Sequence, residues 1–190
     1  MRVIIAEDEA LIRMDLREML AEEGHEVVGE ARDGLEAVEL AGRLRPDVVF
    51  MDISMPRMNG IDAAAAINDQ RFAAVVMVTA FSQAALVEQA SRAGAMAFVV
   101  KPFSRSDIIP AMQIAVSRFA EAAALDAEIA DLSDRLETRK VVERAKGALM
   151  AKGMDEAEAF RRLQKQAMDR RKTLREVAEA VMLASEVAEP

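Results

Sequence analysis

Four short apolar runs in the first half of the chain each lead directly to a polar or charged residue. RVIIA precedes the acid pair Glu7-Asp8, DVVFM precedes Asp52, AVVMV precedes Thr79, and AFVV precedes Lys101. Apolar runs this short are typical of buried strands in a parallel sheet. Because ligands bind beyond the carboxyl ends of the strands in open α/β sheets, these side chains are expected to meet in one crevice.

The segments between these runs have helical periodicity. It predicts helices over residues 9–23, 34–44, 61–68 and 83–93. In the first of them, Leu11, Ile12, Met19 and Leu20 are expected to form the apolar face. Strands that alternate with helices of this length predict an α/β fold, a doubly wound parallel sheet of five strands.

The polar residues at the expected strand ends have a chemistry in common. Three carboxylates without a nearby cation repel one another, so the group favours a hard divalent ion such as Mg²⁺, which prefers oxygen ligands. An aspartate beside such an ion can take up a phosphoryl group as an acyl phosphate. Lys101 would then pair with the phosphoryl oxygens, and Thr79 would donate a hydrogen bond to one of them.

The segments that carry these residues are IIAEDE (4–9), MDISMPRMNG (51–60), VTA (78–80) and VKPF (100–103). In this order they resemble the response-regulator receiver domain of two-component signalling, a flavodoxin-like fold, over residues 1–118. The resemblance implies that a sensor histidine kinase phosphorylates Asp52. It also implies a cis peptide bond between Lys101 and Pro102.

The same resemblance assigns a role to each of the other site residues. The Mg²⁺ ligands would be Glu7 (through water), Asp8, Asp52 and the main-chain carbonyl of Ser54, and the phosphoryl-binding and switch residues would be Thr79, Lys101 and Phe98. Two positions depart from the usual pattern. The family often has aspartate in place of Glu7, and often tyrosine in place of Phe98, whose ring lacks the hydroxyl group.

Residues 119–138 are predicted to form a helical coiled-coil linker. Its apolar residues are spaced four, three and four apart, as in the seam of a coiled coil: Leu125, Ile129, Leu132 and Leu136. The pattern lasts less than two heptads, so a short intermolecular coil and packing within one chain are both compatible with it. Family resemblance favours a homodimer that forms on phosphorylation.

Residues 139–190 are predicted to be entirely helical. A helix should continue from the fifth receiver helix to about Lys152. Capping signatures at Asp155 and Thr173, each followed three residues later by glutamate, predict helices to about Asp169 and Ala184. The result would be a small three-helix bundle in which Phe160 is buried.

Charge separates the two halves of the chain. Residues 1–118 carry a net charge of −6, whereas residues 139–175 carry +7. A basic segment in an acidic chain indicates an anionic partner, although a solvated basic helix face would give the same count.

Three pieces of the C-terminal segment, RAKGALM (144–150), EAFRRLQKQAM (158–168) and LREVAEAV (174–181), resemble the ANTAR domain. The resemblance implies a transcription antiterminator that binds stem-loop RNA as a dimer. Arg144, Lys146 and Gly147 lie in its most characteristic motif. The further candidates, chosen by charge, are Arg161, Arg162, Lys165, Arg170, Arg171 and Lys172.

Two other functional classes are compatible with parts of this sequence. The helical C-terminal domain could bind DNA or a protein partner instead of RNA. An aspartate-based phosphatase would need a second aspartate at Ser54, so catalysis is expected to go no further than Mg²⁺-dependent self-phosphorylation and autodephosphorylation. The absence of cysteine, of a visible signal peptide and of an uninterrupted apolar span predicts a cytoplasmic protein without a membrane partner.

Overall fold

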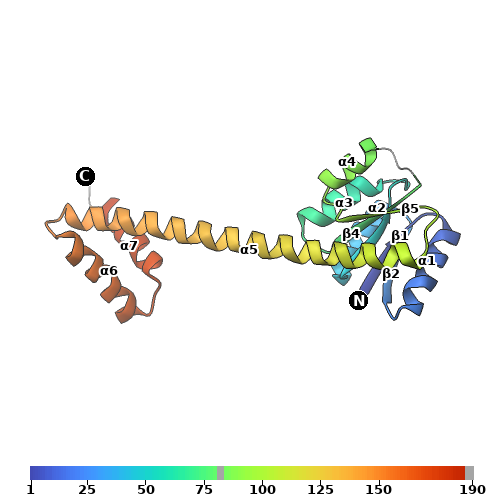
Figure 1. The fold of residues 1–190 in the computed structure, drawn as a ribbon. Helices are drawn as coiled ribbons and strands as arrows, with labels where there is room; N and C mark the ends of the chain where they lie inside the picture. The colour runs from blue at the N-terminus through green and yellow to red at the C-terminus, as the bar shows by residue number, and fades with distance from the viewer. Residues whose placement is uncertain (81–83, 187–190) are drawn as a thin grey trace. The chain divides into compact units, whose positions relative to one another are not determined.

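The computed structural model describes residues 1–80 and 84–186 of the chain. The chain divides into two compact units, Met1–Ala124 and Leu125–Pro190. The first unit contains a β-sheet covered by helices, and the described residues of the second form helices joined by short turns (Figure 1).

The sheet of the first unit has five parallel strands in the order β2-β1-β3-β4-β5. This confirms the predicted doubly wound parallel sheet. The strands are β1 (Arg2–Ala6), β2 (Glu26–Ala31), β3 (Val48–Asp52), β4 (Ala74–Thr79) and β5 (Ala97–Val100). Every residue of β3 and β4 is buried, as expected for central strands covered on both faces.

Helices connect the strands. Wherever a helix end lies within the described residues, it agrees with the predicted end to within two residues. They are α1 (Ala10–Glu22), α2 (Gly34–Leu44), α3 (Gly60–Asp69) and α4 (Ala84–Arg92), followed by α5 (Arg105–Met150). The predicted start of the fourth helix at residue 83 lies outside the described residues.

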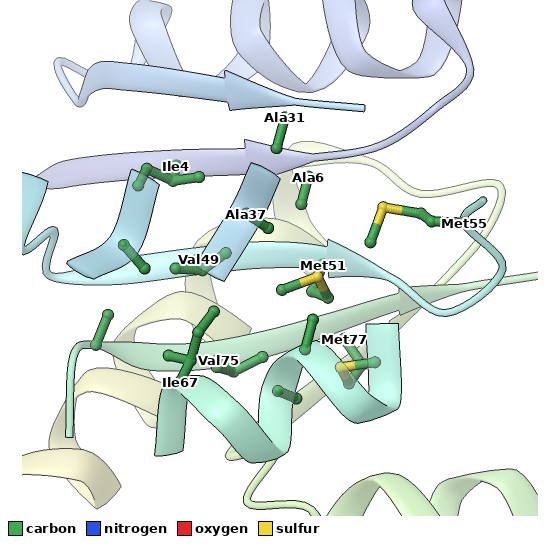
Figure 2. Packing of buried hydrophobic residues seen from close by; sticks show 14 of the residues in the cluster. Ile4, Ala6, Ala31, Ala37, Val49, Met51, Met55, Ile67, Val75 and Met77 are labelled. Carbon is green, nitrogen blue, oxygen red and sulfur yellow. The ribbon is translucent and has the colours of Figure 1, made fainter. Parts of the chain in front are cut away.

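The helices cover the sheet on two sides, and each side has its own hydrophobic cluster. On one side α2 and α3 pack against alternate strand residues such as Ile4, Val49 and Val75, as Figure 2 shows. On the other side α1 and the first turns of α5 pack against the intervening residues, including Phe50 and Val76. Alternation of this kind fixes which strand residues reach either core.

The apolar face of α1 differs from the prediction. Leu11 is 82% exposed, whereas the buried residues of the helix are Arg13, Leu16 and Leu20. Their spacing of three and four is the helical repeat that faces the sheet, so the prediction for Leu20 was right and that for Leu11 was wrong. The apolar face was predicted from apolar residues alone. Arg13 was therefore missed, although it occupies one of the inward positions.

The second unit is built from the end of α5 together with α6 (Glu156–Arg170) and α7 (Leu174–Glu186). Its core contains Val142, Leu149, Leu163 and Val177, one or two residues from each helix. This confirms the predicted three-helix bundle. The prediction for Phe160 was wrong, because this ring is 37% exposed.

Both predicted capping signatures are present in the second unit. Asp155 accepts a hydrogen bond from the main-chain nitrogen of Glu158, and Glu158 accepts one in return from that of Asp155. Thr173 and Glu176 form the same reciprocal pair at the start of α7. Such pairs satisfy amides that the first turn of a helix leaves without partners.

One helix is long and apolar enough to cross a membrane by length and composition alone. Among the described residues this helix is α5, and most of its apolar 18-residue segment is exposed, with 22% of it buried. The first turns of the same helix place Ile108, Met112 and Ala115 in the hydrophobic cluster that α1 also covers. A single helix of this kind is weak evidence for a membrane span.

Candidate functional site

The polar residues at the ends of four strands lie together at the carboxyl edge of the sheet. Glu7 follows β1, Asp52 is the last residue of β3, Thr79 is the last residue of β4, and Lys101 follows β5. Parallel pairing of these strands brings their ends to one edge. The expected convergence is therefore present in the fold.

Lys101 joins two of the carboxylates. Its Nζ lies 2.6 Å from Oε2 of Glu7 and 2.7 Å from Oδ1 of Asp52. The other oxygen of Asp52, Oδ2, accepts a hydrogen bond of 2.7 Å from the main-chain nitrogen of Ser54. Glu7 and Asp52 are both buried, so the ammonium group compensates two carboxylates that have little access to water.

Burial and pairing shift the pKa values of two of these groups in the same direction. Burial raises the pKa of the Glu7 carboxyl, and the hydrogen bond from Lys101 only partly opposes this effect. Burial alone would lower the pKa of the Lys101 ammonium, but hydrogen bonds to Asp52 and Glu7 outweigh it, and the pKa is raised. Lys101 is therefore charged at neutral pH.

Three carboxylates at this edge are close enough to bind one cation. Single oxygen atoms of Glu7, Asp8 and Asp52 all lie within 4.8 Å of one another. Asp8 is exposed, and the other two are buried. An all-oxygen, mostly anionic donor set is compatible with a hard divalent ion such as Mg²⁺.

The loop after Asp52 packs tightly against the strand that it leaves. A Cβ atom on Gly60 would overlap the main-chain oxygen of Asp52, so only glycine fits there. Asn59 caps α3 by accepting a hydrogen bond from the main-chain nitrogen of Asp62. Within this loop Arg57 has a positive φ of 61°, and its side chain pairs with buried Asp33.

The remaining residues at this edge also have defined surroundings. The side chain of Thr79 is buried, and its main-chain oxygen accepts a hydrogen bond of 2.8 Å from the main-chain nitrogen of Lys101. The Lys101–Pro102 peptide bond is cis, as expected. Phe98 is half-buried and packs against the cluster beneath α2 and α3.

Sequence reasoning missed one residue at this edge. Arg13 of α1 is only 8% exposed. Its guanidinium donates a hydrogen bond of 2.7 Å to the main-chain oxygen of Glu7 and another of 3.1 Å to the carboxylate of Glu30. It thereby holds the turn that carries Glu7 and Asp8. The available signal was the position of Arg13, which is three residues before Leu16 and seven before Leu20. This spacing places it on the inward face of the helix.

The basic candidates of the second unit fall into two groups. Lys146 is 8% exposed, and its Nζ lies 2.7 Å from Oε1 of Glu156 and 3.0 Å from Oε2 of Glu143. The hydrogen bond to Glu156, followed by that to Glu143, raises the pKa of Lys146. Lys172 pairs in the same way with Glu176 at 2.9 Å. These two cations are already neutralised within the fold.

The other group is exposed. The side chains that make no ion pair to any described residue belong to Arg144, Arg161, Arg162, Lys165, Arg170 and Arg171. Gly147 is also exposed, and a Cβ atom there would have nothing within 4 Å. Packing within the chain therefore does not require glycine at this position in the middle of a helix.

The four residues of the predicted seam lie on α5. Leu125, Ile129, Leu132 and Leu136 are between 52% and 59% exposed. Within the described residues they belong to none of the hydrophobic clusters. Within the described residues of the second unit, therefore, these four side chains are not packed inside one chain, the alternative left open by the spacing.

A five-stranded parallel sheet with an acid cluster and a lysine at its carboxyl edge is the arrangement of a receiver domain. Residues 3–113 match the family of response regulator receiver domains, and residues 130–182 match the ANTAR domain family. The chain is 64% identical over 182 residues to the transcriptional regulatory protein PdtaR of Mycobacterium tuberculosis, which covers 95% of this chain and 89% of that protein.

Solved structures agree with the family match over the first unit. The response regulator domain of Thermotoga maritima CheB is 36% identical with a TM-score of 0.58, covering 62% of this chain and 96% of that one. The receiver domain of histidine kinase PA1611 from Pseudomonas aeruginosa, solved with magnesium in its active site cleft, is 26% identical with a TM-score of 0.56, covering 61% and 97%.

The chain therefore belongs to the two-component response regulators in which a receiver domain precedes an RNA-binding ANTAR domain of the antitermination type. It is a signalling protein in which the receiver carries the regulatory site and the ANTAR domain carries the output.

Proposed function

We propose that this protein is switched by phosphorylation of Asp52 and, as a dimer, binds stem-loop RNA in the cytoplasm to prevent transcription termination. One observation carries the proposal. The half-buried Lys101 bridges two buried carboxylates at the sheet edge of a chain whose C-terminal part matches the ANTAR family. The partner kinase would be a sensor histidine kinase, as the receiver family implies.

The proposed chemistry is a single phosphoryl transfer. A carboxylate oxygen of Asp52 attacks the phosphorus of a phosphohistidine, the N–P bond breaks, and the histidine nitrogen keeps the electron pair. The product is an acyl phosphate on Asp52. A small phosphodonor would serve in the same way, which is the self-phosphorylation expected from the sequence, and attack by water would reverse the modification.

The residues around Asp52 would divide the remaining work. Glu7, Asp8, Asp52 and the main-chain carbonyl of Ser54 would hold Mg²⁺, which neutralises charge on the transferred group. Lys101, now within 2.7 Å of Asp52, would move its ammonium onto a phosphoryl oxygen. Its separation from Glu7 would make the modified and unmodified states electrostatically different.

Thr79 and Phe98 would transmit this difference. Thr79 ends β4 beside Lys101 and would donate its hydroxyl to the phosphoryl group. Phe98 of β5 is half-buried, and its ring would turn further inward when Thr79 moves. Because phenylalanine has no hydroxyl, this switch would act by packing alone.

The proposed output surface is the exposed basic set of the second unit. Arg144, Lys165, Arg170 and Arg171 are exposed and make no ion pair to any described residue, so they are available to RNA phosphates. The unit contains one aromatic side chain, Phe160, so stacking of several bases on aromatic rings is not expected. Specificity would come from loop bases, because the deep groove of an RNA helix hides its sequence.

We propose the boundaries 1–118 for the receiver, 119–138 for the linker and 139–190 for the RNA-binding domain. The ANTAR match begins at residue 130, inside the proposed linker. Helix α5 passes through both proposed boundaries without interruption, so each boundary is a change of packing partner and not a break in the helix.

A direct binding comparison tests this function. The phosphorylated full-length protein would be titrated at one salt concentration with a paired stem-loop RNA, the same RNA with scrambled loops, and a DNA duplex of equal length. Tightest binding to the intact stem-loops is expected, together with a weaker response for Asp52→Asn. Equal affinity for all three nucleic acids would reduce the second unit to a general basic surface and favour a protein or DNA partner.

A further inference from the structure

A cavity of about 330 Å³ lies between α5 and α7 in the second unit. Its lining residues are Val141, Arg144, Glu179, Met182 and Leu183. Val141 and Met182 are half-buried and pack against the helical core, whereas Leu183 is 63% exposed. The cavity therefore combines an apolar surface open to solvent with one cation and one carboxylate, a composition typical of sites for small, flat ligand groups.

The two charged side chains of this cavity differ in what they already bind. Arg144 is exposed and makes no ion pair to any described residue. Oε1 of Glu179 accepts a hydrogen bond of 2.9 Å from Nε of Arg175, which also pairs with Asp134 of α5. Arg175 thus holds the carboxylate from outside the cavity, and Oε2 of Glu179 can still accept a hydrogen bond from a ligand.

The helix surface beside Arg144 is also open. Gly147 lies one turn after Arg144 on the same side of α5. It is exposed, and a Cβ atom there would meet nothing within 4 Å. Glycine destabilises the middle of a helix, and no neighbour among the described residues requires it here. This position therefore suits the close approach of a molecule outside the chain to the helix backbone.

The carboxylate decides which kind of group the cavity accepts. A phosphate placed there would meet Glu179 as well as Arg144, and repulsion between the two anions would oppose it. A nucleobase is uncharged, has two flat faces and carries its hydrogen-bonding groups on its edge. Because no aromatic ring lines the cavity, the planar guanidinium of Arg144 provides the surface on which such a base stacks.

We propose that this cavity receives one unpaired base of the RNA loop, which stacks on Arg144 and donates its exocyclic amino group to Glu179. Adenine, cytosine and guanine carry such a group, and uracil does not. The backbone of the same nucleotide passes over Gly147, where no side chain obstructs it. The inference rests on the RNA binding of the proposed function and adds the chemistry of one recognition site, while the other exposed cations remain candidates for phosphates.

Removal of the amino group tests the contact to Glu179. The probe is a paired stem-loop RNA that the phosphorylated full-length protein selects from a pool with randomised loops. Each amino-bearing loop base is replaced in turn by an analogue without that group, such as inosine for guanosine or purine riboside for adenosine. One replacement should weaken binding to the natural protein about ten-fold, as expected for a lost hydrogen bond to a charged group.

The same replacement should have little further effect on the Glu179→Ala protein, which has already lost the acceptor. Glu128→Ala is the matched control, because Glu128 is an exposed carboxylate of α5 about 20 Å before Val141 along the helix. This variant should respond to the analogue as the natural protein does. Circular dichroism of each variant would verify that the helical domain remains folded.

Arg144→Lys tests the stacking separately, because lysine keeps the charge and loses the planar group. Binding should weaken about ten-fold, while the slope of log affinity against log salt stays unchanged. A contact to phosphate alone would give nearly full affinity with lysine. Arg170→Lys is the matched control, because Arg170 is an exposed arginine outside the cavity, and it should bind almost normally.

Each outcome decides the inference. It is supported by a loop base whose amino group matters to the natural protein but not to Glu179→Ala, together with the loss of affinity in Arg144→Lys. If every analogue weakens both proteins equally, or if Arg144→Lys binds as tightly as the natural protein, the inference is overturned and the proposed function stands. If the pool yields no RNA that binds better than RNA with scrambled loops, both fail, and the apolar cavity favours a protein partner.

Discussion

The two units of this protein use charged residues in opposite ways. In the receiver domain, Lys101 is held within 2.7 Å of both Glu7 and Asp52, which are buried at the sheet edge. In the ANTAR domain, candidates such as Arg144 and Lys165 are exposed on helix surfaces. A site for a small phosphoryl group must be built in advance to sub-ångström geometry, whereas a site for RNA phosphates needs mobile cations spread over a wide surface.

Lys146 shows that charge alone does not identify the second kind of site. It belongs to the motif with the clearest family resemblance, yet its ammonium pairs with Glu143 and Glu156. Because Glu156 begins α6, this cation connects α5 to α6 in the way that Lys101 connects β5 to β1 and β3. The comparison therefore separates cations that hold the fold from cations that are free to bind.

The largest expected effect comes from removing the proposed phosphoacceptor. Asp52→Asn should abolish phosphorylation by a phosphohistidine donor, because the amide is not a nucleophile for this reaction. Ser54→Ala is the matched control, since the hydrogen bond to Asp52 comes from the main-chain nitrogen, which remains. Radiolabel transfer measures both. Full labelling of the Asp52→Asn protein would show that another residue is the acceptor.

A large effect on stability is expected from the small core of the ANTAR domain. Leu163 is fully buried, and Leu163→Ala should cost about 2–5 kcal/mol of the free energy of unfolding. The loss should unfold this domain selectively, because its core is small. Reduced helical circular dichroism with Asp52 labelling intact is the expected result.

Ile67→Ala in the receiver is the reciprocal variant, because Ile67 lies on the inner face of α3 and is as fully buried as Leu163. It should lower the midpoint for loss of Asp52 labelling during denaturation and leave RNA binding of the unmodified protein unchanged. If both substitutions destroyed both activities together, the two units would unfold as one cooperative body, and the comparison between them would lose its basis.

The sequence predicted which residues meet at the receiver site, because the carboxyl ends of parallel strands lie along one edge of the sheet. Once Asp52, Thr79 and Lys101 were assigned to strand ends, pairing of the strands brought them together. Arg13 was missed because its contact is to a main-chain oxygen, which leaves no pattern of residue types. In the helical domain the caps at Asp155 and Thr173 were predictable from local sequence.

Positions that depend on packing between helices were harder to predict. Phe160 was expected in the core, yet Ala159 and Leu163 are the buried residues of α6. Lys146 was named as an RNA-binding candidate because of the motif in which it lies, whereas its two carboxylate partners come from different helices. Local spacing cannot report such contacts, since they depend on the angle at which α6 returns along α5.

A moderate effect on RNA affinity should distinguish the two kinds of cation. Lys165→Ala should weaken RNA binding a few-fold and reduce the slope of log affinity against log salt by about one, as expected for one lost phosphate contact. Lys146→Ala should leave that slope unchanged and instead lower thermal stability, because it leaves Glu143 and Glu156 without their common partner. The opposite result would place Lys146 at the RNA surface.

The smallest effect concerns the cap of α7. Hydrogen bonds from the main-chain nitrogen of Thr173, from Lys172 and from the Thr173 hydroxyl lower the pKa of Glu176 from 4.5 to about 2. Because the pKa is lower in the folded state, the stabilisation is fully present above about pH 4.5 and is lost as the pH falls toward 2. The receiver shows the opposite sign, since burial raises the pKa of Glu7.

Titration of the carboxyl carbon resonances by nuclear magnetic resonance would measure the lowered pKa of Glu176 and the raised pKa of Glu7 in one protein. Glu176→Gln should remove the pH dependence of α7 stability between pH 4.5 and 2, whereas Glu179→Gln, in the same helix but outside the cap, should keep it. An ordinary pKa for Glu176 would mean that the cap is open in solution. The start of α7, which carries Arg175 and its ion pair to Asp134 of α5, would then be frayed, and that ion pair would be lost with it.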